Sequence, residues 1–296
     1  MRQFILGTDW WTDCDDAVAM RLLARAHKAG EIRMLGIGLN ACMEYSAASL
    51  EGFLQLEGVY DIPLGIDLEA TDFGGNPPYQ KRLAACNEHG RTNADVCDAV
   101  KLYRKIFAES QEKIEIIEIG YLQVMANVLK SGPDDISPLS GRELVRQKVS
   151  KIWAMAGKWD EPCGRENNFT RNARSREAGH WFCELCPVPI SFLGWEIGYD
   201  VLTGGQLAKD DFLYRALCDH GSSGGRSSWD PMLVLMALIG DEAAAGYAVV
   251  RGRAVVDPVT GENHFCPSES GMHSYVVKER DNTYYADAIH ERIRSL

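Results

Sequence analysis

The residues best suited to chemistry are four aspartates that fall within eight positions near the amino terminus. Asp9, Asp13, Asp15 and Asp16 belong to the segment GTDWWTDCDDAVA, directly after a short apolar run. Two carboxylates about 4 Å apart repel each other by roughly 4 kcal/mol at an effective dielectric constant of 20. Such crowding is stable where some of the acids are protonated or where a cation lies among them. Oxygen ligands alone select a hard cation such as Ca²⁺ or Mg²⁺, so the cluster predicts a metal site.

Helix capping is the alternative explanation of this cluster. Asp13 would be the N-cap of a helix, and Asp15 and Asp16 would lie in its first turn, where the helix dipole stabilises each acid by about 0.3–1 kcal/mol. Capping does not account for Asp9 at the end of the strand, and it does not outweigh several carboxylate repulsions. We therefore favour a metal site over capping alone.

Other polar residues follow other apolar runs. Asn40 ends IRMLGIGLN, Glu166 and Asn168 come after KIWAMAG, and Asp230 opens the helical pattern WDPMLVLMAL. Each has a structural alternative: a turn residue for Asn40, a solvated acid for Glu166, and a helix cap for Asp230. Together they lie where ligands bind in α/β sheets, at the carboxyl ends of strands. The sequence contains no GxGxxG or GxxxxGK[ST] motif.

Short apolar runs alternate with helical patterns along most of the chain. This alternation predicts an α/β fold: an open, mainly parallel, Rossmann-like sheet with helices on both faces. After about Tyr247 the pattern changes, which predicts a small antiparallel C-terminal appendage before a final helix. No boundary interrupts the alternation, so residues 1–296 are expected to form one domain. The polar, glycine-rich segments 67–96 and 219–228 are candidate lids or binding loops. A simple surface connection is the alternative for residues 67–96.

Charge and composition restrict the class of partner. The formal net charge of −11 argues against nucleic acid and against an anionic membrane surface, both of which require clustered Lys and Arg. The sequence has no run of about 18 apolar residues, so we expect no membrane span. The amino terminus does not resemble a signal peptide. The nine cysteines are then expected to be reduced thiols in a cytoplasmic protein.

Five segments together resemble a known family, and they occur in its order along nearly the whole chain. The chain resembles the nucleoside hydrolases, the inosine-uridine-preferring N-ribohydrolase superfamily. GTDWWTDCDDAVA is similar to the family's first motif, in the variant DTDxGxDxDD form. The other four segments that resemble the family are IEIGYLQVMANVL, AMAGKW…ENNF, PVPISFLGWEIG and SSWDPMLVLMAL.

The resemblance implies an open α/β sheet with one Ca²⁺ at the strand ends. Carried over to this sequence, Asp9, Asp16 and Asp230 would be the carboxylate ligands, and Ile119 would provide a backbone carbonyl. Asp9 would also be the general base towards the attacking water. The family's leading acid is replaced here by glycine and the loop is two residues longer, so Asp13 is a second candidate for the metal or base role.

The same resemblance assigns residues to the sugar. Asp15 would bind the ribose 2′-hydroxyl. Asn168 and Glu166 would hold the 3′ and 5′ sides of the ring, and Asn40 would lie near the sugar and the base.

The leaving group is where this sequence departs most from the family. Trp229 stands where the family has a histidine that serves as the leaving-group acid. Some relatives instead raise the proton affinity of the base by aromatic stacking, and Trp10, Trp11, Trp159 and Trp229 are candidates for this. The alternative is that these tryptophans only pack. His220 in the glycine-rich loop is a further candidate acid.

The predicted function is Ca²⁺-dependent hydrolysis of the N-glycosidic bond of a ribonucleoside or related riboside, by a metal-activated water and with inversion. The partner would be this small molecule, and family members are commonly homodimers or homotetramers. One alternative is a non-catalytic riboside-binding protein of the same fold. A less favoured alternative is an Mg²⁺ phosphatase of the haloacid-dehalogenase kind, because TDCDDAV departs from the hhhhDxDx[TV] pattern.

Overall fold

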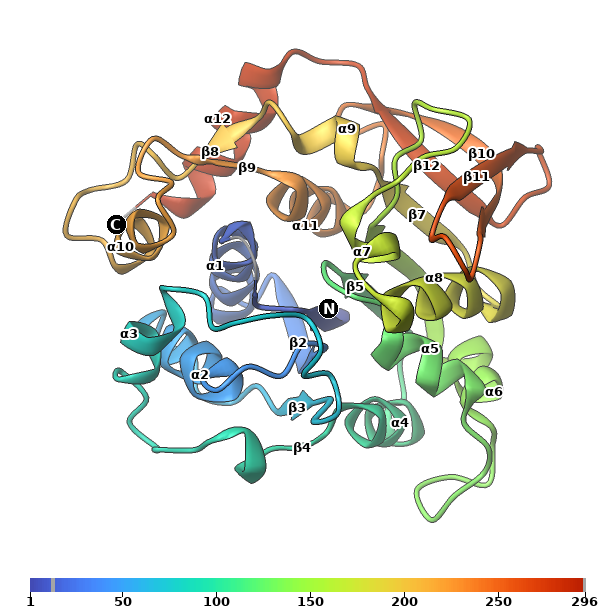
Figure 1. Ribbon diagram of the computed structural model, residues 1–296, viewed down its shortest axis with the longest axis horizontal. Coiled ribbons are helices and arrows are strands. Elements are labelled where there is room, and N and C mark those ends of the chain that lie inside the picture. Colours follow the sequence, from blue (N-terminus) through green and yellow to red (C-terminus); the bar gives the residue numbers. More distant parts are fainter. Residues whose placement is uncertain (12–13, 295–296) are drawn as a thin grey trace.

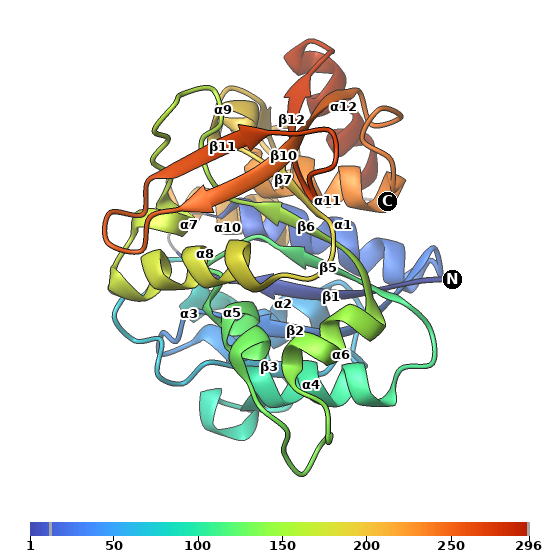
Figure 2. The ribbon, with the colours of Figure 1, turned by 90° about the vertical axis from the view of Figure 1, so that its right-hand side faces the viewer.

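The computed structural model describes residues 1–11 and 14–294. A ten-stranded sheet forms its centre, in the order β11-β10-β12-β7-β6-β5-β1-β2-β3-β4 (Figures 1 and 2). The strands from β12 to β4 pair in parallel, so the predicted open, mainly parallel α/β fold is confirmed. The strands of this sheet are β1 (Arg2–Thr8), β2 (Ile32–Leu39), β3 (Leu64–Ile66), β4 (Cys97–Asp98), β5 (Ile114–Glu118), β6 (Val149–Met155), β7 (Ile190–Leu193), β10 (Tyr247–Val256), β11 (Asn263–Pro267) and β12 (His273–Lys278).

Helices cover both faces of the sheet, because the central strands bury side chains on both sides. In β1, Phe4 and Leu6 belong to one hydrophobic cluster, and Ile5 between them belongs to another. The first cluster includes residues of α1 (Asp15–Lys28), α2 (Ser46–Leu56), α10 (Phe212–Asp219), α11 (Trp229–Ile239) and α12 (Asn282–Ile293). The second includes residues of α4 (Ala99–Glu109), α5 (Gln123–Lys130), α6 (Gly141–Lys148) and α8 (Ala173–Leu185).

The short helices are α3 (Gln80–Ala84), α7 (Asn167–Thr170), α9 (Trp195–Gly198) and the 3₁₀ turn η1 (Asn93–Asp95). Among the described residues no helix is long and apolar enough to span a membrane.

The antiparallel strands expected after Tyr247 are present, and they extend the main sheet. The long strand β10 pairs antiparallel with both β11 and β12. β12 also pairs in parallel with β7, and this pairing joins the three antiparallel strands to the central sheet. A separate antiparallel ladder of two short strands, β8 (Leu202–Thr203) and β9 (Arg226–Ser227), lies outside this sheet.

The order of the strands determines where the sheet can bind a ligand. From β1 the chain proceeds outward through β2, β3 and β4, then returns to β5 on the other side of β1. Ligands of doubly wound sheets bind at such a switch point, outside the carboxyl ends of the two strands. Here these ends are Asp9, directly after β1, and Ile119, directly after β5.

A buried arginine fixes α1, the helix that begins next to this switch point. The Arg21 side chain is 1% exposed, and its guanidinium donates hydrogen bonds to Glu57 and to both carboxylate oxygens of Asp211. These two acids belong to the ends of α2 and α10, so the pairs tie three helices together. Breaking a buried ion pair of this kind costs about 3–5 kcal/mol.

Candidate active site

A cavity of about 210 Å³ lies at the carboxyl ends of β1, β5 and β6. A larger hollow of about 660 Å³ lies at the other ends of the strands, between α4 and the starts of β1 and β2, and it contains no comparable group of acids among the described residues. The smaller cavity is lined by Asp9, Trp11, Asp15, Asp16, Ile119, Met155, Glu166, Asn167, Asn168, Trp195, Arg226, Trp229 and Asp230.

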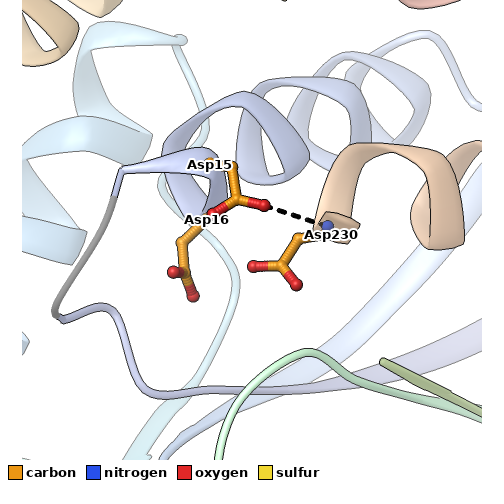
Figure 3. A group of neighbouring side chains, drawn as sticks. All are labelled: Asp15, Asp16 and Asp230. Carbon is orange, nitrogen blue, oxygen red and sulfur yellow. Dashed lines mark hydrogen bonds between the residues drawn. The ribbon is translucent and has the colours of Figure 1, made fainter. Parts of the chain in front are cut away.

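Three buried carboxylates converge in this cavity. Asp15 and Asp16 come from the first turn of α1, and Asp230 comes from the first turn of α11 (Figure 3). One ligand atom of each lies within 4.8 Å of the others, and each residue is at most 4% exposed. At that separation each pair of charges repels by about 3 kcal/mol at an effective dielectric constant of 20.

The charge balance of this group fits a divalent cation. Each helix N-terminus contributes about half a positive charge, so two helix ends leave roughly two of the three negative charges uncompensated. The group offers only carboxylate oxygens, the ligands that Ca²⁺ and Mg²⁺ prefer. Helix capping alone therefore does not account for the cluster.

Hydrogen bonds hold the three carboxylates in position. Asp15 Oδ2 accepts a hydrogen bond from the backbone N–H of Asp230 at 3.1 Å, so a side chain of α1 caps the start of α11 (Figure 3). Asp16 Oδ1 accepts hydrogen bonds from the Thr8 hydroxyl and, at 3.3 Å, from the backbone N–H of Trp10. The two helix ends and the end of β1 are thereby fixed to one another.

Asp9 lines the same cavity but is not one of the three converging acids. The family resemblance implied Asp9, Asp16 and Asp230 as carboxylate ligands, whereas the structure groups Asp15 with the last two. Asp9 Oδ1 accepts a hydrogen bond from the backbone N–H of Trp11 at 3.0 Å, which fixes the carboxylate at the end of β1. Asp13 lies outside the described residues, and Cys14 occupies the N-cap position of α1.

The turn after Asp9 depends on a strained backbone at Trp10. Its φ is +49°, a left-handed conformation that costs a bulky residue about 1–3 kcal/mol. The Trp10 carbonyl accepts a hydrogen bond from Gln80 Nε2 at 2.6 Å, and its indole N–H donates to Ser49 Oγ at 2.8 Å. These contacts hold the strained turn, which directs Asp9 and Trp11 to the cavity while the Trp10 ring stays in the core.

Glu166 and Asn168 reach the cavity from the loop after β6, as expected from the sequence. One Glu166 oxygen accepts from the backbone N–H of Asn168 at 2.8 Å, and the other accepts from that of Gly157 at 2.9 Å. Gly157 has φ +83°, which favours glycine at this turn. The Asn168 side chain donates to the Met155 carbonyl at 2.9 Å. Glu166 is therefore a loop support as well as a lining residue, and the solvated-acid alternative does not describe it.

Asn40 does not line the cavity and is fully buried. Its Oδ1 accepts from the backbone N–H of Tyr121 at 3.1 Å, which links the end of β2 to the turn after β5. A Cβ at Gly120 would lie 2.7 Å from this oxygen and would collide with the backbone of Asp9. Asn40 and Gly120 thus let β5 approach β1 closely.

The tryptophans divide into two pairs. Trp11 and Trp229 line the cavity. Trp10 packs edge-on against Phe53 and Tyr79, and Trp159 packs among aromatic residues of the other core cluster, so for these two the packing alternative describes their position.

Part of the long segment 67–96 contacts Trp11, which lines the cavity. The Trp11 indole N–H donates to the carbonyl of Gly75 at 2.6 Å. The guanidinium carbon of Arg171 lies 4.8 Å from the centre of the Trp11 ring, and Arg171 also donates to the Phe73 carbonyl. These contacts join the segment to a lining residue, and its role as a lid or binding loop stays a prediction.

Arg226, Trp195, Met155 and Asn167 also line the cavity, although no sequence pattern selects them individually. Met155 and Trp195 follow from the sheet rule in retrospect, since they lie at the carboxyl ends of β6 and β7. Arg226 belongs to the glycine-rich segment 219–228, a candidate lid or binding loop, but nothing in the local sequence directs its side chain to this cavity.

Glu118 is a second feature that sequence reasoning missed. It ends β5 next to Ile119, it is fully buried, and burial raises its pKa to about 8. Within the described part of the chain neither carboxyl oxygen has a hydrogen-bond partner. A side chain at Gly7, on the neighbouring strand, would collide with this carboxyl. Glu118 thus occupies the space that a larger residue on β1 would need.

Glu118→Gln is expected to stabilise the protein at neutral pH. Between about pH 4.5 and pH 8 the unfolded state loses the Glu118 proton while the folded state keeps it, so the wild-type free energy of unfolding falls as the pH rises. The neutral amide of the variant escapes this penalty, which amounts to as much as about 3 kcal/mol near pH 7. Urea unfolding with chelator, at about pH 5 and about pH 8, measures the difference.

Glu115→Gln is the matched control, because Glu115 lies on the same strand and forms an ion pair with Arg2. Glu115→Gln should not become more stabilising, relative to wild type, between about pH 5 and about pH 8. Parallel pH dependences for wild type and Glu118→Gln would contradict a raised pKa at Glu118.

Comparison with known proteins identifies relatives in structure only. No protein-family model matches the sequence, and no curated protein sequence matches it. The inosine-uridine preferring nucleoside hydrolase from Bacillus anthracis superposes with a TM-score of 0.70 at 15% identity, over 99% of both chains. The purine-preferring ribonucleoside hydrolase from Gardnerella vaginalis gives 0.70 at 15% identity, over 99% of this chain and 98% of its own. The type III effector XopQ, in complex with adenosine diphosphate ribose, gives 0.64 at 14% identity, over 99% and 93%. The resemblance expected from the sequence is thus confirmed at the level of the fold, which is that of the nucleoside hydrolases.

Proposed function

We propose that this protein is a metal-dependent hydrolase that cleaves the N-glycosidic bond of a ribonucleoside or related riboside. The observation that carries the proposal is the convergence of Asp15, Asp16 and Asp230 in a cavity at the switch point of the sheet. The fold supports it, since two proteins that share this fold are nucleoside hydrolases by name.

The acids of the cavity suit a hard cation, for which we propose Ca²⁺. The ligands would be the carboxylates of Asp16 and Asp230 and the Ile119 carbonyl, with Asp9 or Asp15 as the remaining carboxylate. When bound, the cation would lower the pKa of a water and hold the diol of the sugar. The donor set supports this, because every proposed ligand atom is an oxygen.

The chain's own residues would carry out the displacement. Asp9, fixed by the Trp11 N–H, would accept a proton from the attacking water as it bonds to the anomeric carbon. Buried carboxylates nearby would stabilise the oxocarbenium-like transition state. A single displacement predicts inversion at that carbon. Asp13 stays a candidate for sharing the role of base.

The sugar would be held by polar side chains of the cavity. Asp15 would accept a hydrogen bond from the 2′-hydroxyl, and Asn168 and Glu166 would contact the other side of the ring. Hydrogen bonds to backbone groups already orient the Glu166 carboxylate and the Asn168 amide, which lowers the entropy lost on binding. Asn40 would act by positioning the turn after β5.

A panel of ribonucleosides assayed for free ribose, with and without chelator, tests the proposed function. We expect ribose release that chelation abolishes and added Ca²⁺ restores. Release of ribose from none of the nucleosides, or release that is insensitive to chelator, would contradict it. Phosphate release from a general phosphatase substrate would instead support the haloacid-dehalogenase alternative.

Binding without turnover is the second candidate function. It is favoured by one observation, that a protein with this fold is known in complex with adenosine diphosphate ribose. Calorimetry with ribosides that are not hydrolysed would reveal it. The cytoplasmic location and the homodimeric or homotetrameric state expected from the sequence stay predictions.

A further inference from the structure

The lining of the cavity includes one arginine. Arg226 is the only basic residue among the described residues that line it. It belongs to β9 and pairs with Thr203 of β8, so its backbone is held by a ladder rather than by a free loop. Its guanidinium carbon lies 5.3 Å from the centre of the Trp229 ring.

The Trp229 ring beside this arginine packs against a second tryptophan. The rings of Trp195 and Trp229 are stacked, with centres 6.3 Å apart and an angle of 29° between their planes. The Trp229 indole N–H donates to the Trp195 carbonyl at 2.7 Å, so the ring orientation is fixed and the N–H is already engaged. Gly198 permits this arrangement, since a Cβ there would lie 2.6 Å from the Trp229 Cα. The Trp229 ring is therefore held in place, and its indole N–H is not available to a ligand in the cavity.

The lining of the cavity contains two chemically different groups of side chains. Carboxylates and the Asn168 amide suit the hydroxyl groups of a sugar, whereas Trp195 and Trp229 suit a planar leaving group. Arg226 lies against Trp229, one of the aromatic residues. None of the described lining residues is a histidine. His220, the candidate acid in the sequence, is not among these lining residues, and its ring contacts the Ser222 hydroxyl at 2.9 Å.

We propose that Arg226 contacts the leaving group and stabilises the negative charge that develops on it. This inference rests on the proposed riboside hydrolysis and adds the class of substrate. As the glycosidic bond breaks, its electron pair goes to the leaving group. Water bonds to the anomeric carbon, its proton goes to Asp9, and the leaving group departs as an anion beside the guanidinium. Solvent protonates this anion after release.

Arginine cannot act as the leaving-group acid, because its guanidinium stays protonated. The substrates selected are therefore ribosides whose leaving group forms a stable anion, such as oxo-substituted heterocycles and aryl oxides. Bases that must be protonated on the ring before they leave, such as adenine, would be poor substrates. We expect p-nitrophenyl riboside to be cleaved at least as well as inosine.

Arg226→Gln tests this role with a series of aryl ribosides of decreasing leaving-group acidity. The kcat/KM for unsubstituted phenyl riboside should fall by about 10²-fold, as after loss of one oxyanion-hole donor, and that for p-nitrophenyl riboside by less than about tenfold. The dependence of rate on leaving-group acidity would become steeper. Arg253→Gln is the matched control, because Arg253 pairs with Glu184 on the surface and does not line the cavity.

A binding experiment separates failure of this proposal from failure of the proposed function. The absorbance of p-nitrophenol, titrated with wild-type protein in the presence of ribose and Ca²⁺, should show a shift towards the phenolate that Arg226→Gln lacks. That result supports Arg226 even if wild type releases ribose from no substrate. Equal losses of kcat/KM across the aryl series, or no phenolate shift with wild type, would overturn the assignment.

Discussion

Asp16→Asn is expected to weaken Ca²⁺ binding by at least about 10²-fold. Asp16 is 1% exposed and lies within 4.8 Å of two other carboxylates, so its charge is central to the proposed site. Substitutions of residues that only support metal ligands already cost about 10- to 100-fold in affinity, and loss of a ligand charge costs at least as much. Calorimetric titration with Ca²⁺ measures the affinity, and ribose release should fall with it.

When the cation is absent, the same substitution should stabilise the protein. With chelator, Asp16→Asn removes two repulsions of about 3 kcal/mol each, while Asn Oδ1 can still accept from the Thr8 hydroxyl and the Trp10 N–H. It should therefore melt at a higher temperature than wild type in chelator, yet gain little when Ca²⁺ is added. A ligand that binds only the folded protein stabilises wild type instead.

Asp230→Asn should reproduce both effects if the three acids form one site. Asp135→Asn is the control for a lost surface charge, because Asp135 is exposed on the loop before α6. Normal Ca²⁺ affinity in Asp16→Asn, or an equal rise in melting temperature on adding Ca²⁺ to both proteins, would show that the cation does not bind among these acids.

Much of the site follows from periodicity and one rule about sheets. The alternation of apolar runs and helical patterns predicts parallel strands, and parallel strands end at one edge. This is sufficient to bring Asp9, Glu166 and Asn168 into one cavity, although 159 positions of sequence separate the first from the last. Asp230 begins α11 after the separate β8–β9 ladder, so this rule alone does not place it. None of these residues needed a tertiary contact to be selected.

The geometry among neighbouring acids could not be obtained in that way. Whether Asp9 or Asp15 joins the converging group depends on the first turn of α1 and on the positive φ of Trp10. Sequence patterns do not encode that angle for a tryptophan. Asn40 was expected to lie near the sugar and the base, and the sequence did not indicate that its side-chain oxygen joins the end of β2 to the turn after β5.

Arg226 escaped prediction for a different reason. Its position depends on the two-residue ladder between β8 and β9, whose partners are more than twenty residues apart and carry no alternating pattern. Long-range pairing of such short strands is decided by the surrounding fold rather than by local propensity.

Asp9→Asn is expected to lower kcat by about 10²-fold or more, because the variant lacks a base for the attacking water. Asn Oδ1 can still accept the Trp11 N–H, so the turn at Trp10 and the shape of the cavity should be retained. Since Asp9 lies outside the converging group, Ca²⁺ affinity should fall less than in Asp16→Asn. Sugar binding should also be largely kept, because Asp15 and Asn168 are unchanged. Turnover measured by ribose release and affinity measured by calorimetry separate these effects.

The pH dependence of Asp9→Asn distinguishes a lost base from a damaged cavity. If the variant lacks only the proton acceptor, hydroxide can replace the activated water, and its kcat should keep rising with pH where that of wild type levels off. A distorted cavity would lower kcat by the same factor at every pH. Asp13→Asn is the paired variant, because Asp13 is the other candidate base. Near-normal turnover in Asp9→Asn together with a large loss in Asp13→Asn would transfer the role of base to Asp13, and Asp9 would then serve to fix the turn at Trp10.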